Sequence, residues 1–249
     1  MSAAANISIT LATAGRVLTQ LRRDHRTLAM LLAVPCVLLT LLNWVFDDTP
    51  QVFDRIGAPL LGIFPFVMMF VITSVATLRE RTSGTLERLL AMPMAKLDLL
   101  LGYAVAFGLV ATVQAALAAG LALGLLGLDV AGPVWLLILV AVLDALLGMA
   151  LGLFVSAFAR SEFQAVQFLP AFVLPQLLLC GLFVPRDRMQ DVLQWISDAL
   201  PLSYAVDAMT RVTRSSEIGG DLQRDLVIVG GASILALVLG AATLRRRTP

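Results

Sequence analysis

The charged residues of this chain are gathered into short clusters, and the stretches between the clusters are long enough to cross a membrane. Five mostly apolar runs carry no charge at all: Thr27–Phe46, Ile56–Leu78, Leu99–Leu128, Phe163–Val184 and Leu226–Leu244. A sixth run, Val130–Ala159, is interrupted only by Asp144. Each run is close to or above the roughly 20 residues that a helix needs to span the hydrocarbon. Hydrophobic residues make up 59% of the chain, against about 45–50% in soluble domains, so we expect an integral membrane protein.

These runs favour helices over a membrane β-barrel. Barrel strands need segments of about ten residues that alternate between apolar and polar, and the runs show no such alternation. The sequence therefore predicts an all-α integral membrane protein with six transmembrane helices. The predicted spans are 27–46, 56–78, 98–127, 133–158, 163–184 and 226–244. No repeat or linker divides residues 1–249, so we expect a single transmembrane domain.

Basic residues are distributed unequally between alternate connections. One side receives four before the first run, four within 79–96, Arg160, and three at the C-terminal end. The other side receives Arg55 and five in 185–225, where seven acidic residues outnumber them. Cytoplasmic loops are enriched in basic residues, so we expect both termini and the 79–96 loop to be cytoplasmic and 185–225 to be extracellular. The strong preference for arginine over lysine points to a GC-rich bacterial genome, and we therefore expect the bacterial plasma membrane as the location.

Two segments outside the spans show helical periodicity. In 6–24, Ile7, Leu11 and Leu18 fall on one side while Thr13 and Arg16 fall on the other. This pattern predicts an N-terminal amphipathic helix lying in the cytoplasmic interface. In 185–225, apolar residues recur at helical spacing after 187, and a proline at 201 stops the first helix. We therefore predict short extracellular helices between spans five and six.

The residues that intrinsic catalysis requires are scarce. His25 is the only histidine of the chain, and its two cysteines, Cys36 and Cys180, lie inside apolar runs. No zinc site and no nucleophile with a paired base can be assembled from them. The only lysine, Lys96, is followed by a leucine and lacks the glycine-rich setting of a P-loop. We expect no catalytic residue, no metal site and no enzymatic activity in this chain.

Asp144 is the one ionisable residue expected near the middle of the bilayer. An unpaired charge there costs roughly 2.5–3.5 kcal/mol on insertion scales. Either a role in a translocation path or a role in packing of the helix bundle would account for it. Two glycine pairs, Gly120/Gly124 and Gly148/Gly152, have the spacing that lets membrane helices approach closely.

The connection between the second and third runs has an unusual composition. Residues 79–93 read RERTSGTLERLLAMP and carry five charged side chains. Gly84 breaks the preceding helix, and Pro93 prevents continuation beyond it. The intervening Thr85–Ala91 predicts a short amphipathic helix, with Glu87 in the first turn complementing the helix dipole. Such a helix could dock into a groove on a soluble partner; alternatively, the stretch is a charged loop that only sets topology.

The same stretch resembles the signature of type-2 ABC transporter permeases, the class that includes the daunorubicin-resistance exporters. The resemblance extends through Gly102, the Cys-Gly-Leu-Phe-Val-Pro stretch at 180–185 and the Leu-Pro-Leu-Ser-Tyr stretch at 200–204. Met92 and Tyr103 depart from the threonine and lysine common in that family. The resemblance covers essentially the whole chain.

This resemblance implies that the 79–96 loop is a cytoplasmic coupling helix between spans two and three, which contacts a separate ATPase subunit. The residues that match the coupling motif are Glu80, Arg81, Gly84, Thr85, Leu86, Glu87, Leu90 and Pro93. The residues that match the extracellular cap are Gly181, Pro185, Pro201 and Tyr204. The expected partners are an ABC ATPase that binds ATP and Mg, a second permease subunit and membrane lipids. The chain itself is expected to bind no cofactor and no nucleic acid.

The expected function is the permease subunit of an ATP-driven exporter, acting on a hydrophobic or amphipathic drug, antibiotic or lipid. Aromatic and methionine residues in 64–70 offer apolar surface for such a substrate. Two alternatives remain open at this stage. An ion- or proton-coupled secondary transporter would need several intramembrane ionisable groups and usually inverted repeats. A membrane scaffold protein would have no need of a coupling helix.

Overall fold

The computed structural model describes residues 3–85, 96–216 and 219–243 of the chain, and the regular structure of these residues is entirely helical. The helices are α1 (Ala3–Arg23), α2 (His25–Val45), α3 (Pro50–Thr82), α5 (Lys96–Gly124), α6 (Val134–Ser156), α7 (Glu162–Phe172), α8 (Leu174–Leu179), the 3-10 helix η1 (Arg186–Arg188), α9 (Asp191–Ala199), α10 (Pro201–Arg214) and α11 (Gly220–Thr243).

Six segments of this part of the chain are long and apolar enough to cross a membrane. They are His25–Val45, Pro50–Thr82, Leu97–Gly124, Val134–Ser156, Glu162–Leu179 and Gly220–Thr243. The predicted fold class, an all-α membrane protein with six spans, is confirmed.

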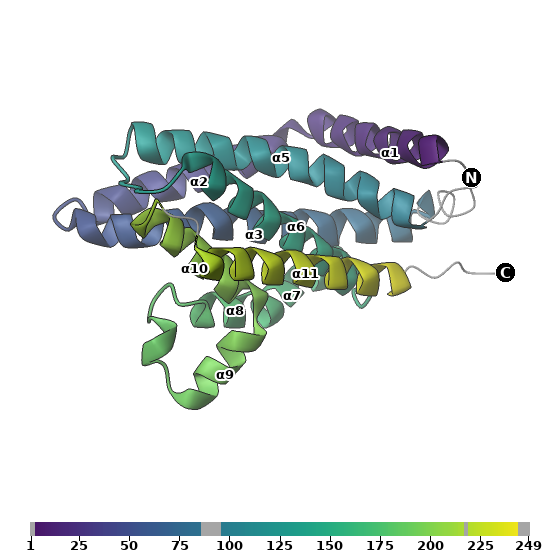
Figure 1. Ribbon diagram of the computed structural model, residues 1–249. Coiled ribbons are helices and arrows are strands. Elements are labelled where there is room, and N and C mark those ends of the chain that lie inside the picture. Colours follow the sequence, from purple (N-terminus) through teal and green to yellow (C-terminus); the bar gives the residue numbers. More distant parts are fainter. Residues whose placement is uncertain (1–2, 86–95, 217–218, 244–249) are drawn as a thin grey trace.

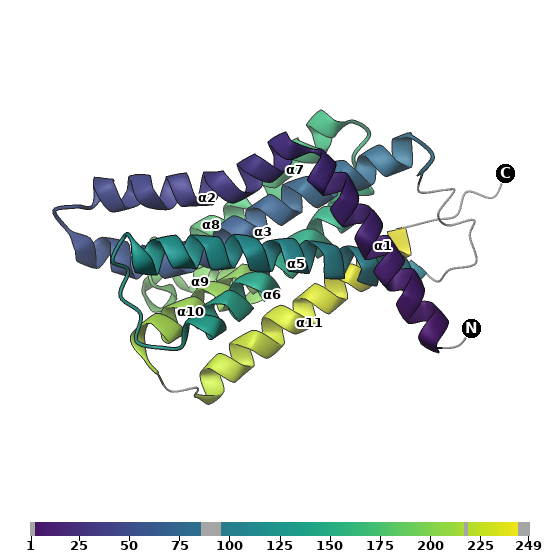
Figure 2. The ribbon, with the colours of Figure 1, turned by 90° about the horizontal axis from the view of Figure 1, so that it is seen from above.

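The long helices run side by side, with α3 and α6 at the centre (Figure 1). The start of α1 and the end of α11 lie at the same end of this bundle, where α1 crosses the other helices obliquely (Figure 2). The segment from α8 to α9 lies on the side of the bundle away from α1 and α5 (Figure 1). The arrangement separates two polar regions, one near the chain ends and one around α9 and α10.

The central helix α3 is longer than the predicted 56–78 span. It begins at Pro50, because proline at the first helical position has the required φ and needs no hydrogen-bond donor there. Its 33 residues correspond to a length of about 50 Å, against about 30 Å for the hydrocarbon core. Helix α3 is therefore longer than the hydrocarbon is thick, which allows Arg55 and Arg79, near its two ends, to lie in polar surroundings.

The fifth span is divided and shorter than predicted. The residue Val173 separates α7 from α8, and Pro175 stands in the first turn of α8, where its missing N–H is tolerated. The helix ends at Leu179 instead of continuing to 184, and Gly181 follows with a φ of 94°. That left-handed conformation favours glycine and turns the chain toward η1.

Helix α1 packs on the bundle with a different face from the one that its apolar periodicity suggests. Thr13, Ala14 and Val17 are buried, whereas Ile7 and Leu11 remain 61% and 58% exposed. The buried face contacts α5 at Gly102, where a Cβ would approach the Thr13 side chain to less than 3.0 Å. A glycine at 102 is therefore needed for this close helix contact, while Ile7 and Leu11 are left free for other apolar surroundings.

Candidate functional site

Three consecutive residues at the end of α3 bind three different parts of the bundle. Successive residues of a helix point about 100° apart, so Arg79, Glu80 and Arg81 reach in different directions. Arg79 binds both carboxylate oxygens of Glu162 at the start of α7, at 2.6 and 2.8 Å. Arg81 donates to the carbonyl oxygen of Ser156 at the end of α6, at 2.9 Å. We call the residues 79–81 the α3 junction.

The central residue of the junction, Glu80, connects α3 to both α1 and α5. Arg16 of α1 forms an ion pair with Glu80 at 2.8 Å. The hydroxyl of Tyr103 on α5 also donates to the Glu80 carboxylate, and Arg16 donates to the Tyr103 oxygen at 3.3 Å. The Glu80 side chain is only 12% exposed. Because an acid in the last turn of a helix opposes the helix dipole, Arg16 supplies the compensating charge.

The junction leads directly into the predicted coupling segment. Helix α3 ends at Thr82, and Gly84 adopts a φ of 71°, as glycines that follow helix ends commonly do. The hydroxyls of Ser83 and Thr85 lie 2.9 Å apart. The four remaining predicted coupling residues, Leu86, Glu87, Leu90 and Pro93, lie outside the described residues. What the structure describes is the base of the predicted coupling segment, held against α1, α5, α6 and α7.

A cavity of about 410 Å³ lies beside the junction, between α1, α3 and α5. Its polar lining includes Gln20, Asp24 and Glu80, and its apolar lining includes Phe107. Asp24 also caps the start of α2 by accepting hydrogen bonds from the Thr27 hydroxyl and the Thr27 N–H, which lower the pKa of this carboxyl. The base of the predicted coupling segment therefore has both a network of polar contacts and a cavity next to it.

The structure places Asp144 inside the packed bundle. Its side chain is fully buried on α6, and neither carboxylate oxygen has a hydrogen-bond partner among the described residues. A Cβ built at Gly62 of α3 would lie 3.5 Å from Asp144 Oδ2 and 3.1 Å from the end of the Met209 side chain. Asp144 is thus surrounded by α3 and α10, and it does not line the cavity beside the junction.

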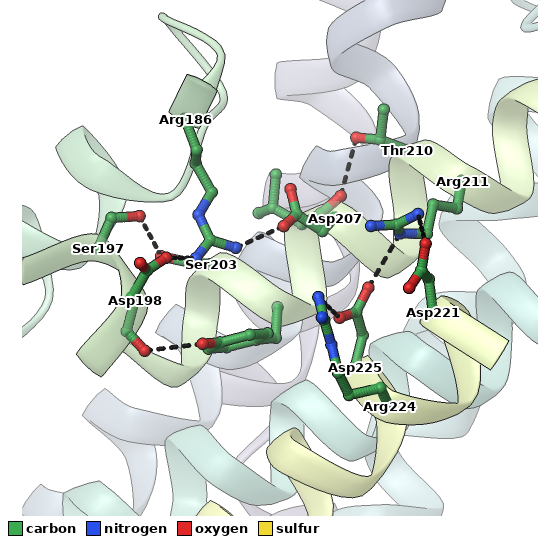
Figure 3. Close-up of polar contacts among 12 residues, drawn as sticks. Arg186, Ser197, Asp198, Ser203, Asp207, Thr210, Arg211, Asp221, Arg224 and Asp225 are labelled. Atoms are coloured by element: carbon green, nitrogen blue, oxygen red, sulfur yellow. Dashed lines mark hydrogen bonds and ion pairs between the residues drawn. The ribbon is translucent and has the colours of Figure 1, made fainter. Parts of the chain in front are cut away.

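Three of the four predicted cap residues, Gly181, Pro185 and Tyr204, lie next to Arg186, and the fourth, Pro201, begins α10. This arginine follows Pro185, which precedes η1, and it binds Asp198 of α9 and Asp207 of α10 (Figure 3). Its guanidinium also lies 4.9 Å from the ring centroid of Tyr204, whose hydroxyl donates to the Asp198 carbonyl at 2.8 Å. Gly181 packs against the Arg186 side chain. One arginine therefore connects η1, α9 and α10.

A second polar group connects α10 to α11. Arg211 binds Asp221 and Asp225, both at 3.1 Å, and Arg224 lies 3.5 Å from Asp225 (Figure 3). Burial raises the pKa of Asp207 on the same helix, although the adjacent Arg186 favours its charged form. Arg186 therefore keeps Asp207 from being an uncompensated buried charge.

Sequence reasoning identified Glu80, Arg81 and Tyr204 but missed the residues that bind them. Arg16 was assigned only to the polar face of the amphipathic helix, and Tyr103 only to a departure from a family pattern. Arg186 and Asp207 carried no motif of their own. For the charged residues a signal was available: Arg16, Arg186 and Asp207 lie on segments outside the spans, and an unpaired charge near the hydrocarbon is costly.

A helical bundle whose described residues include six candidate membrane spans is a multi-pass membrane protein. The chain belongs to the ABC-2 type transporter family, whose sequence model matches residues 9–213. This match confirms the resemblance first noted at residues 79–93.

Curated relatives carry transporter names. The inner membrane transport permease YhhJ of Escherichia coli is 30% identical over 141 residues, which are 56% of this chain and 38% of YhhJ. The probable multidrug ABC transporter permease YbhR of the same organism is 27% identical over 153 residues, 61% of this chain and 42% of YbhR. ABC transporter G family member 20 of Dictyostelium discoideum is 27% identical over 156 residues, 63% of this chain and 21% of that protein. The chain spans less than half the length of each of these relatives.

Proposed function

We propose that this chain is the membrane-spanning permease subunit of an ATP-driven exporter. It would work with a separate ABC ATPase, which binds ATP and Mg, and with a second permease subunit, either a copy of this chain or a homologue. The observation that carries the proposal is the position of the family's Gly-Thr-Leu-Glu motif. This motif begins at Gly84, immediately after a junction that joins α3 to four other helices.

The junction suggests how force from an ATPase would reach the bundle. A displacement of the coupling segment would act first on α3, then on α1 and α5 through Glu80, and on α6 and α7 through Arg81 and Arg79. ATP binding would favour one arrangement of these helices over the other, as a population shift driven by differential affinity. The substrate proposed from the apolar spans is a hydrophobic or amphipathic drug, antibiotic or lipid.

The proposal is tested by isolating the chain, with an affinity tag, from native membranes at matched expression. We expect an ABC ATPase to co-purify, and we expect Glu87→Lys to reduce its recovery without reducing the amount of permease in the membrane. Loss of one charge-assisted contact corresponds to about a tenfold weaker association. Transport by the purified chain in the absence of any ATPase, driven by an ion gradient, would instead establish the secondary-transporter alternative.

The proposed orientation, with cytoplasmic termini and an extracellular α9, is tested by cysteine labelling in intact cells. The two native cysteines, Cys36 and Cys180, are first replaced by serine. We expect Gln190→Cys, at an exposed position before α9, to react with an impermeant thiol reagent from outside. Ser83→Cys, in the coupling segment, serves as the matched control and should react only after lysis. The reverse pattern would invert the topology.

A further inference from the structure

A polar cavity lies at the end of the bundle opposite the α3 junction. It has a volume of about 570 Å³ and lies between the start of α3, the turn from Gly181 to η1, and α10. This volume falls within the range of roughly 300–1,000 Å³ typical of small-molecule sites. Its charged lining consists of Arg55, Arg186, Arg188, Arg211, Arg214, Asp187 and Asp207.

The charges of this lining are not balanced. Arg186 and Arg211 are held by carboxylates, as Figure 3 shows. Arg55, Arg188 and Arg214 form no ion pair with another described residue. Of the two aspartates in the lining, Asp187 also forms no such ion pair. The lining itself holds five arginines against two aspartates, which is a cationic excess.

The three unpaired arginines come from three different elements. Arg55 lies on α3, Arg188 in η1 and Arg214 in the last turn of α10. The two paired arginines beside them, Arg186 and Arg211, are held in place by their carboxylates. The Nε of Arg186 is buried and has no hydrogen-bond partner among the described residues. Arginines that separate elements contribute to one cavity are suited to a polyatomic anion, because each guanidinium can offer two parallel N–H donors.

The cavity also has an apolar part. Pro59, Leu182 and Val206 line it, and Pro59 lies one helical turn beyond Arg55 within the α3 span. An anion held by the arginines would thus have apolar surface next to it in the direction of the hydrocarbon. A small inorganic anion would leave that surface unused, whereas an amphiphile would cover it.

We propose that this cavity binds the anionic headgroup of an amphiphile, with the phosphate or carboxylate on Arg55, Arg188 and Arg214 and the apolar part on Pro59, Leu182 and Val206. The binding step needs no ATPase, so its failure and the failure of the proposed exporter function are separate results.

The proposal is tested by calorimetric titration of the purified full chain in an uncharged detergent. The probes are dihexanoylphosphatidylglycerol, its zwitterionic counterpart dihexanoylphosphatidylcholine, and inorganic phosphate. We expect the phosphatidylglycerol to bind at least tenfold more tightly than the phosphatidylcholine and more tightly than phosphate. Arg188→Gln and Arg214→Gln should each weaken its binding about tenfold, the lower end expected for a charge-assisted hydrogen bond.

Arg224→Gln provides the matched control, because it removes the same charge from the same end of the molecule without altering the cavity lining. It should leave the binding unchanged, and thermal unfolding of all three variants checks that they are folded. Equal binding of the two lipids, or equal loss in Arg224→Gln and Arg188→Gln, would overturn the proposal. Phosphate binding as tight as that of phosphatidylglycerol would overturn the amphiphile assignment in favour of a free anion.

Discussion

Replacing Gly148 or Gly152 with alanine is expected to destabilise the bundle by about 3 kcal/mol or more, at or above the upper end of ordinary overpacking. A Cβ on Gly148 would approach the carbonyl oxygen of Phe66 to less than 3.0 Å, and a Cβ on Gly152 would do the same at Phe70. Both obstacles are backbone atoms of α3, so no side-chain rotation can relieve the clash. The central helices would have to separate, and we expect a lower yield of folded protein and a lower melting temperature.

The matched controls are Gly120→Ala and Gly124→Ala in α5. They have the same spacing and the same chemical change, but no atom of another element lies within 4 Å of the position of either Cβ. Alanine also favours a helix over glycine by up to about 1 kcal/mol, so these variants should be as stable as the parent or slightly more stable. Similar losses in all four variants would show that the contact between α3 and α6 is not what requires glycine.

The two glycine pairs illustrate what the sequence could and could not predict. Both have the small-residue spacing of close helix packing, and nothing in their local sequence distinguishes them. Their difference arises from tertiary structure: α6 is enclosed by the bundle, while the Gly120 face of α5 is exposed. The helical class and the six spans were predictable because hydrocarbon forces each apolar run to satisfy its own backbone hydrogen bonds.

Helix ends and helix faces were less predictable, for physical reasons. The early start of α3 depends on the favourable proline at 50. This proline lies outside the apolar run 56–78, so the hydropathy of that run does not predict it. The face on which α1 docks depends on the space left by Gly102, which is a property of another helix. Within the site, the acid Glu80 and the glycine Gly84 could be identified from one motif, but the partners Arg16 and Tyr103 are 64 and 23 residues away from Glu80.

Among the charged contacts of the α3 junction, loss of the Glu80 contact is expected to lower the free energy of unfolding most. In Glu80→Gln, Arg16 keeps its charge but loses its ion pair, and the Tyr103 hydroxyl loses a charged acceptor. Hydrogen bonds to charged groups contribute about 1.5–3 kcal/mol, so the free energy of unfolding should fall by that amount. Arg79→Gln is the control one residue away: its pair with Glu162 is 60% and 51% exposed, and exposed pairs contribute about 0–1 kcal/mol.

A double-mutant cycle separates the direct contact from general disruption. If Arg16 and Glu80 stabilise each other, Arg16→Gln combined with Glu80→Gln should lose less than the sum of the single variants, with a coupling energy above about 0.5 kcal/mol. Strictly additive losses would mean that the ion pair contributes nothing and that the two side chains act through other contacts.

The Glu80 contact should also have a functional consequence, which is measurable at Gln190 on the opposite side of the protein. This prediction rests on the proposed partnership with an ATPase. In the assembled transporter, a nonhydrolysable ATP analogue should change the labelling rate of Gln190→Cys, because movement of the coupling segment would pass through the α3 junction to the bundle. Adding Glu80→Gln should abolish most of that change while nucleotide binding by the ATPase remains, since the nucleotide site is on the other subunit. Adding Arg79→Gln should preserve it, because the solvent-exposed pair with Glu162 is a weak link. An undiminished response in the Glu80 variant would mean that the junction braces the fold without transmitting motion.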